Sequence, residues 1–224
     1  MVAAEFEFRR DKRDDPDAKR AFNQRVRTVY LAEIGARTAA AAASDAPLLE
    51  RLCHFWSNHF TVSIQRPVIH GLAAAFEREA IRPHVTGRFA DMLLAVARHP
   101  AMLLYLDNAQ SIGPDSPVGL RRDKGLNENL GRELLELHTL GVDGGYTQQD
   151  VEALARILTG WSVAQLRDPQ PGGFFFRPMV HEPGAKTLLG RIYAEGGYAE
   201  GEAALLALAA HPATARHVAV KLAR

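Results

Sequence analysis

The chain has 224 residues, 47% of them hydrophobic, and this length suffices to bury a sizeable core as one domain or as two small ones. Its 27 lysines and arginines nearly balance its 26 aspartates and glutamates, and the net charge of +1 argues against nucleic acid or an anionic membrane as a partner of the whole chain. A single cysteine, Cys53, excludes a disulfide framework within the chain and a zinc site made from several cysteines.

The N-terminal segment shows no signal peptide, because Met-Val-Ala-Ala-Glu is followed by charged residues, and no apolar run approaches the length of a membrane span. Residues 1–15 are predicted to be a charged, flexible N-terminus, and residues 16–224 a single helical domain. Asp15 and Pro16 predict the N-cap and the first residue of a helix. The apolar face and alanine-rich end of this helix are Phe22, Val26, Val29, Tyr30, Ile34 and Ala39–Ala43.

A second helix is predicted from Pro47 to about Ser63, with His59 at the centre of a wide apolar face. A lone histidine on such a face is usually a core residue with satisfied hydrogen bonds, and this interpretation stands beside a functional one. Asn58 and His54 lie on the opposite flank, where they would either line a cleft or face water. The apolar face consists of Leu48, Leu49, Leu52, Phe55, Trp56 and Phe60.

Three segments lead to the central part of the chain. A helix from Pro67 to Ile81 ends before Pro83, because proline disfavours helix in the residue before it, and its charged end is expected to be solvated. A buried stripe from Phe89 to Val96 and a short helix from Ala101 to Asp107 follow. The polar loop 108–124 is expected to be disordered or, alternatively, to cover a pocket or contact an anionic ligand through Arg121, Arg122 and Lys124.

The central stretch, Leu126 to Trp161, predicts two antiparallel helices joined by the short turn 142–145. The first, Asn127 to Leu140, ends at Gly141, because glycine tolerates the left-handed conformation that ends a helix. Thr147 and Asp150 form an acidic capping box that opens the second helix. The predicted buried residues are Leu126, Leu130, Leu134 and Leu137, then Val151, Leu154, Leu158 and Trp161.

One carboxylate of the first central helix, Glu133, points into the apolar stripe, with Asn129 on its flank. A carboxylate that faces a core must find a partner or take up a proton. The neighbouring charges have a structural explanation as a lattice of Glu128, Arg132 and Glu136 at i, i+4 spacing. This lattice leaves Glu133 without a partner, so we expect one from another helix.

The segment after Trp161 changes in character. Phe174–Phe176 and Thr187–Leu189 predict a small β-hairpin or a pair of extended segments. His181 and Lys186 bracket the turn between them, where they would add a polar tip to the same pocket or simply be solvated. Two helices, Glu202 to Ala210 and Pro212 to Arg224, are predicted to complete the chain.

The central stretch resembles the signature of the domain of unknown function 1800 family, a bacterial family, over NENLGRELLELHTLGVDGGYTQQDVEALARILTGW. The resemblance extends from about Leu48 onward, through FWSNHF, FEREAIRPHVTGRFADMLLAVARHPAMLLYLDNAQS, HEPGAKTLLG and HPATARHVAVKLAR. It implies a mostly helical domain with no established reaction, substrate or cofactor. Family members are usually longer at both ends, so the chain is expected to be a fragment and its compartment stays open. Gly131 stands where the family typically has alanine, a departure that slightly weakens the helix.

These observations predict an all-α, multi-helix, bundle-like domain with a small β-hairpin insertion after Trp161. The chain has no nucleophile elbow, P-loop, dinucleotide fingerprint or metalloprotease helix motif. Two classes of function remain. We favour a scaffold or binding domain, in which a buried polar cluster locks the helices together and the surface engages a protein partner.

The alternative is a metal-dependent or acid/base hydrolase-type enzyme with Glu133, Glu136 and His59 as catalytic residues. His59 and Glu133 point into apolar faces of different helices, so they would form an imidazole–carboxylate pair or bind a divalent metal as cofactor. Arg132 would hold a carboxylate or an anionic substrate. The predicted polar pocket consists of Asn58, Asn129, Arg132, Trp161, His181 and Lys186.

Overall fold

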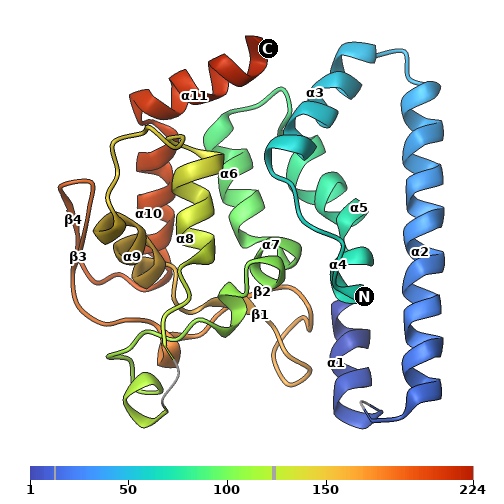
Figure 1. Ribbon diagram of the computed structural model, residues 1–224, viewed down its shortest axis with the longest axis horizontal. Helices are drawn as coiled ribbons and strands as arrows, with labels where there is room; N and C mark the ends of the chain where they lie inside the picture. The colour runs from blue at the N-terminus through green and yellow to red at the C-terminus, as the bar shows by residue number, and fades with distance from the viewer. Residues whose placement is uncertain (13, 123–124, 224) are drawn as a thin grey trace.

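The computed structural model describes residues 1–12, 14–122 and 125–223, and it is mostly helical (Figure 1). Within these residues lie the α-helices α1 to α11 and two separate two-stranded antiparallel sheets after Gly160. This confirms the predicted fold class. None of the helices in the described ranges is long and apolar enough to cross a membrane. Lys124 of the predicted basic loop and Arg224 at the end of the last predicted helix lie outside the described residues.

The N-terminal segment, whose flexibility stays a prediction, contains a helix. Helix α1 (Val2–Asp11) occupies it, and Val2 is buried in the core. Helix α2 (Pro16–Ala42) begins as predicted, because the Asp15 side chain accepts hydrogen bonds from the amides of residues 17 and 18. Val26 is the buried residue of α2. This long helix lies along one side of the molecule (Figure 1).

The next helices are shorter than the sequence suggested. Helix α3 (Pro47–His59) ends at His59 rather than near Ser63. The predicted helix 67–81 is interrupted, because Gly71 and Leu72 separate two short helices and a Cβ on Gly71 would lie 2.4 Å from the Met1 side chain. Glycine thus makes room for the packed N-terminus. The segments are α4 (Pro67–His70), α5 (Ala73–Phe76), the π-helical turn η1 (Glu77–Ile81) and the 3₁₀ turn η2 (Arg82–His84).

The charged end of this region is not simply solvated. Arg82 donates two hydrogen bonds to Glu50, at 2.8 and 2.7 Å, and lies 3.6 Å from Glu77. Glu77 also accepts from Arg37 of α2 at 2.6 Å. Ion pairs therefore connect the long helix to the rest of the domain.

Helix α6 (Phe89–Arg98) forms the centre of the core, and the predicted stripe of Met92, Leu93 and Val96 is fully buried. Helix α10 (Tyr198–Ala209) packs against it, and α11 (Pro212–Ala223) lies across one end of α10 (Figure 1). The remaining short segments are α7 (Pro100–Tyr105) and the 3₁₀ turns η3 (Asn108–Gln110), η4 (Gly119–Arg121) and η6 (Pro178–Val180).

The central stretch forms the predicted helix pair, with one change in helix type. Helix α8 (Asn129–Glu133) continues as a π-helical turn, η5 (Leu134–His138), before the chain turns into α9 (Gln148–Ile157). The predicted capping box of Thr147 and Asp150 is present. A Cβ on Gly131 would lie 3.0 Å from the Ala155 nitrogen, so glycine allows α8 to approach α9 closely.

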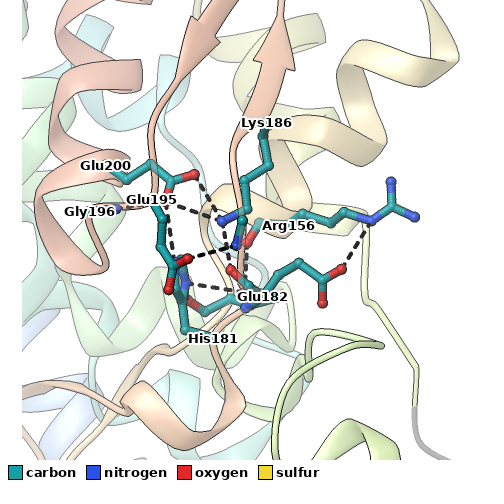
Figure 2. A network of polar contacts seen from close by, with 9 residues as sticks. Arg156, His181, Glu182, Lys186, Glu195, Gly196 and Glu200 are labelled. Carbon is teal, nitrogen blue, oxygen red and sulfur yellow. Dashed lines mark hydrogen bonds and ion pairs between the residues drawn. The ribbon is translucent and has the colours of Figure 1, made fainter.

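The extended segments pair with neighbours rather than with each other. Strand β1 (Trp161–Val163) pairs antiparallel with β2 (Phe174–Phe176), with Trp161 opposite Phe176. Strand β3 (Lys186–Leu188) pairs with β4 (Arg191–Tyr193), with Lys186 opposite Tyr193. The two small sheets place the loop 177–185 beside α9 and α10, and this loop carries part of the candidate site (Figure 2).

Candidate functional site

Two polar clusters with buried members bring together side chains with potential chemistry. The first, which we call the histidine cluster, consists of His59, His138, His217, Lys221 and Glu133. The His59 ring centre lies 5.8 Å from that of His138 and 6.0 Å from that of His217. Glu133 Oε2 lies 3.8 Å from His138 Nε2. His59 and Glu133 therefore approach the same region, but in the described residues His138 stands between them and no hydrogen bond or ion pair joins the two.

The hydrogen bonds of His59 fix its protonation. Its Nε2 lies 3.1 Å from the His138 carbonyl oxygen, which can only accept, so Nε2 carries the proton. Its Nδ1 then accepts from Lys221 Nζ at 3.2 Å. Burial and the Lys221 charge lower the His59 pKa to about 4. His59 is thus neutral with both nitrogens occupied, which matches the satisfied core histidine that the sequence allowed as an alternative.

His138 differs, because both of its ring nitrogens are buried without a hydrogen-bond partner in the described residues. Sequence reasoning missed it. At the α-helical turn of about 100° per residue, positions five apart lie about 140° from each other, so His138 was not expected to face Glu133. The π-helical turn η5 brings positions i and i+5 onto the same face. Burial and the neighbouring His59 and Lys221 lower the His138 pKa to about 3.

These two histidines predict a stability loss in mild acid. Their pKa values lie below the ordinary 6.5 only in the folded state, so the unfolded chain binds more protons below that pH. Stability is therefore lost as the pH falls from about 6.5 toward 4. We expect His138→Leu to reduce the slope of unfolding free energy against pH by up to about 1.4 kcal/mol per pH unit, measured by urea unfolding between pH 4 and 7. Identical slopes in variant and wild type would show that His138 titrates normally.

The carboxylates of α8 and η5 divide into two groups. Arg132 donates to Glu128 at 2.8 Å and to Gln148 at 2.9 Å, so part of the predicted surface lattice exists. Glu136 contacts the Tyr146 hydroxyl instead of Arg132. Glu133 is half-buried, and burial together with the Glu136 charge raises its pKa.

The other predicted pocket residues do not gather around Glu133. Asn58 and Asn129 are exposed, and Asn129 lines a shallow cavity with residues 125–128. Trp161 is fully buried in the core, where its ring stacks on Tyr198 at 5.5 Å between ring centres. His181 and Lys186 belong to the second cluster.

The second cluster, which we call the buried network, lies between α9, the loop after β2, β3 and α10 (Figure 2). Lys186 Nζ donates to the Glu182 carbonyl oxygen at 2.6 Å and to Glu200 Oε2 at 3.2 Å. His181 Nε2 lies 3.3 Å from the same Glu200 oxygen. The side chains of Lys186, His181 and Glu200 are 5%, 6% and 0% exposed, so water is excluded from these contacts.

Backbone and hydroxyl groups complete the buried network. His181 Nδ1 donates to the Thr159 carbonyl oxygen at 2.8 Å. The Thr159 hydroxyl donates to the Arg156 carbonyl oxygen and accepts from the Glu182 amide. The Glu182 carboxylate accepts from the Asp115 amide at 3.0 Å, and Arg156 lies 3.8 Å away (Figure 2). The alternative in which His181 and Lys186 are simply solvated is therefore wrong, because both side chains are buried against Glu200, which sequence reasoning did not select.

Within the described residues, the possible ligand side chains do not gather into a metal site of three or more ligands. Among the residues that the structure describes, no three His, Cys, Asp or Glu side chains lie close enough to share a metal ion. In the histidine cluster, Lys221 occupies the one lone pair of His59. Metal binding by His59 and Glu133 stays a prediction, and a metal there would have to displace Lys221.

Comparisons with known proteins give one match. The family model described as "Protein of unknown function (DUF1800)" matches residues 2–224. A search of curated proteins found no match, and a search of solved structures found none either. The match includes α1 and α2, which precede the segment from about Leu48 onward that carries the sequence resemblance.

Proposed function

This chain belongs to the DUF1800 family, and we propose that it is a scaffold or binding domain. In this proposal the buried polar clusters hold the helices together, and the surface engages a protein partner. The observation that supports it is that the polar side chains of the buried network contact one another and backbone groups instead of solvent. Lys186 and His181 each pair with Glu200 and with a backbone carbonyl oxygen, and the three side chains are almost completely shielded from solvent.

The energetics of buried charges support a structural role for this network. Burying a charge costs several kcal/mol, and only a partner with good geometry compensates it. The compensated groups come from three separate segments, namely the loop after β2, strand β3 and helix α10. The network therefore favours one arrangement of these segments over alternatives, as buried polar groups do in several proteins.

A second candidate function is acid/base catalysis by Glu133 and Glu136. In this candidate, His59 Nε2 donates to the His138 carbonyl oxygen and so positions the backbone of η5. One observation favours it. Glu133 is half-buried, and in the described residues its nearest basic group is His138, which is neutral at pH 7 because of its lowered pKa. A carboxyl whose pKa is raised by its surroundings is suited to donate and accept protons near neutral pH.

The variant Glu133→Gln distinguishes the two functions. The raised pKa of Glu133 means that its contribution to stability is present in acid and is lost as the pH rises through the folded pKa. We therefore expect Glu133→Gln to be slightly more stable than the wild type at pH 7, with a smaller difference at pH 4. Urea unfolding at both values measures this, and Glu128→Gln, which breaks the exposed pair with Arg132, is the matched control.

The same variants are assayed with generic ester, phosphate and glycoside substrates. The scaffold proposal expects no turnover that depends on Glu133. A wild-type activity that disappears in folded Glu133→Gln and survives in Glu128→Gln would overturn it in favour of the enzyme.

A further inference from the structure

A cavity lined by apolar and polar side chains shares no residue with either cluster. It has a volume of about 660 Å³ and lies where α2, the α4–α5 segment, the α6–α7 junction and the loop before β2 meet. This volume is within the range of small-molecule pockets. Its walls include apolar side chains, among them Val29, Leu72 and Phe174, and the polar side chains of Glu33, Arg78, Glu79, Arg98 and His99.

His99 presents one N–H group toward a wall residue of this cavity. Its Nδ1 accepts a hydrogen bond from the Ala101 amide at 3.1 Å, so the ring proton is on Nε2. Nε2 lies 3.4 Å from Glu79 Oε2. Burial lowers the His99 pKa, and the ring is a neutral donor at pH 7.

Arg98, the neighbouring residue, is held by other partners. Its Nη2 donates to Glu202, its guanidinium lies 5.1 Å from the Tyr198 ring centre and 5.8 Å from that of Trp161, and its Nε is shielded from solvent.

Arg78 is the basic side chain of the cavity wall with a loosely held donor. Its Nη1 donates to Glu33 at 2.8 Å, whereas its Nη2 lies 3.7 Å from Glu79. A guanidinium offers five N–H donors in a fixed plane, which suits a carboxylate.

Glu79 occupies the donors of His99 and Arg78 only loosely. It lies 3.4 Å from His99 Nε2 and 3.7 Å from Arg78 Nη2, whereas charge-assisted hydrogen bonds are about 2.7–2.9 Å long. Its side chain is 58% exposed and is therefore free to turn into water. A ligand carboxylate that approaches these donors more closely would therefore displace Glu79 from them.

We propose that this cavity binds a small monocarboxylic acid with an apolar body. The carboxylate accepts from His99 Nε2–H and from Arg78 Nη2 in place of Glu79, and the apolar body lies against Val29, Leu72 and Phe174. This inference rests on the proposed function in one respect, since it takes the chain to be a binding domain. It names the class of ligand that such a domain takes at this position.

Hexanoate and its neutral analogue hexanamide are the probes, titrated into the whole chain by isothermal calorimetry. We expect hexanoate to bind roughly tenfold more tightly, because hydrogen bonds to a charged group contribute about 1.5–3 kcal/mol. Glu79→Gln removes the competing carboxylate, so it should strengthen hexanoate binding several-fold and leave hexanamide unchanged. Equal affinity of the two probes, or unchanged hexanoate affinity in Glu79→Gln, would overturn the proposal.

A matched pair of variants tests the location. Ala75 lines this cavity, whereas Ala74 lines a neighbouring cleft beside α2 and not this cavity. Ala75→Phe should abolish hexanoate binding and Ala74→Phe should retain it, with circular dichroism as the check of folding. If Ala75→Phe does not fold, the Glu79→Gln titration decides alone. Absence of hexanoate binding leaves the scaffold proposal standing, because that proposal is tested by unfolding and turnover.

Discussion

Replacing Lys186 with methionine is expected to lower the free energy of unfolding by about 3–5 kcal/mol, the usual loss when one partner of a buried ion pair is removed. The variant leaves Glu200 with a fully buried carboxylate that has lost its ammonium partner, and it leaves the Glu182 carbonyl oxygen without its lysine donor. Methionine fills much the same space as the lysine stem, so lost packing contributes little. Urea unfolding followed by circular dichroism measures the change.

A lysine on the surface provides the control. Lys19 of α2 is exposed, and Lys19→Met should change the free energy of unfolding by less than about 0.5 kcal/mol. If Lys186→Met were as harmless as this control, Glu200 would have to be uncharged in the folded protein, and the buried network would not hold the fold through its charges.

Trp161→Ala is the second substitution with a large expected effect, a loss of about 3–5 kcal/mol. Trp161 is fully buried, and its ring lies 5.4 Å from Phe174 and 5.5 Å from Tyr198 between ring centres. The backbone of α10 approaches it so closely that a Cβ on Gly201 would lie 2.5 Å from Trp161 Cζ2. Removing the indole therefore leaves a large cavity between β1, β2 and α10, and thermal unfolding should register it.

A double-mutant cycle checks the packing argument. Gly201→Ala alone should cost about 1–3 kcal/mol, because the added methyl group meets the indole. In the Trp161→Ala background the same substitution should cost much less, since the methyl group then enters free space. Strictly additive losses would contradict the packing, because residues in direct contact are expected to couple.

The sequence predicted the elements whose determinants are local. The amphipathic stripe of α6, the Asp15 N-cap and the Thr147–Asp150 capping box depend on residues within one or two helical turns, and all three are present. The break at Gly71 was not predicted, because it depends on the side chain of Met1, which is distant along the chain.

The candidate sites were predictable only in part. Glu133 and His59 do approach one region, as their positions on apolar faces suggested, but the π-helical turn placed His138 between them. A pattern read at the α-helical period has no means of detecting this change. His181 and Lys186 have the composition of a solvated loop, and they are buried because Glu200 of α10 compensates their polar groups. That compensation depends on tertiary contacts across the small sheets.

The coupling free energy between Lys186 and Glu200 tests the scaffold proposal most directly. It is obtained from urea unfolding of the wild type, Lys186→Met, Glu200→Leu and the double variant. We expect each single variant to be strongly destabilised and the double variant to recover, with a coupling of about 2–3 kcal/mol. Single variants that are as stable as the wild type or more stable, with a coupling below about 0.5 kcal/mol, would contradict the proposal. Such a result would mark the network as a functional site maintained at the expense of stability.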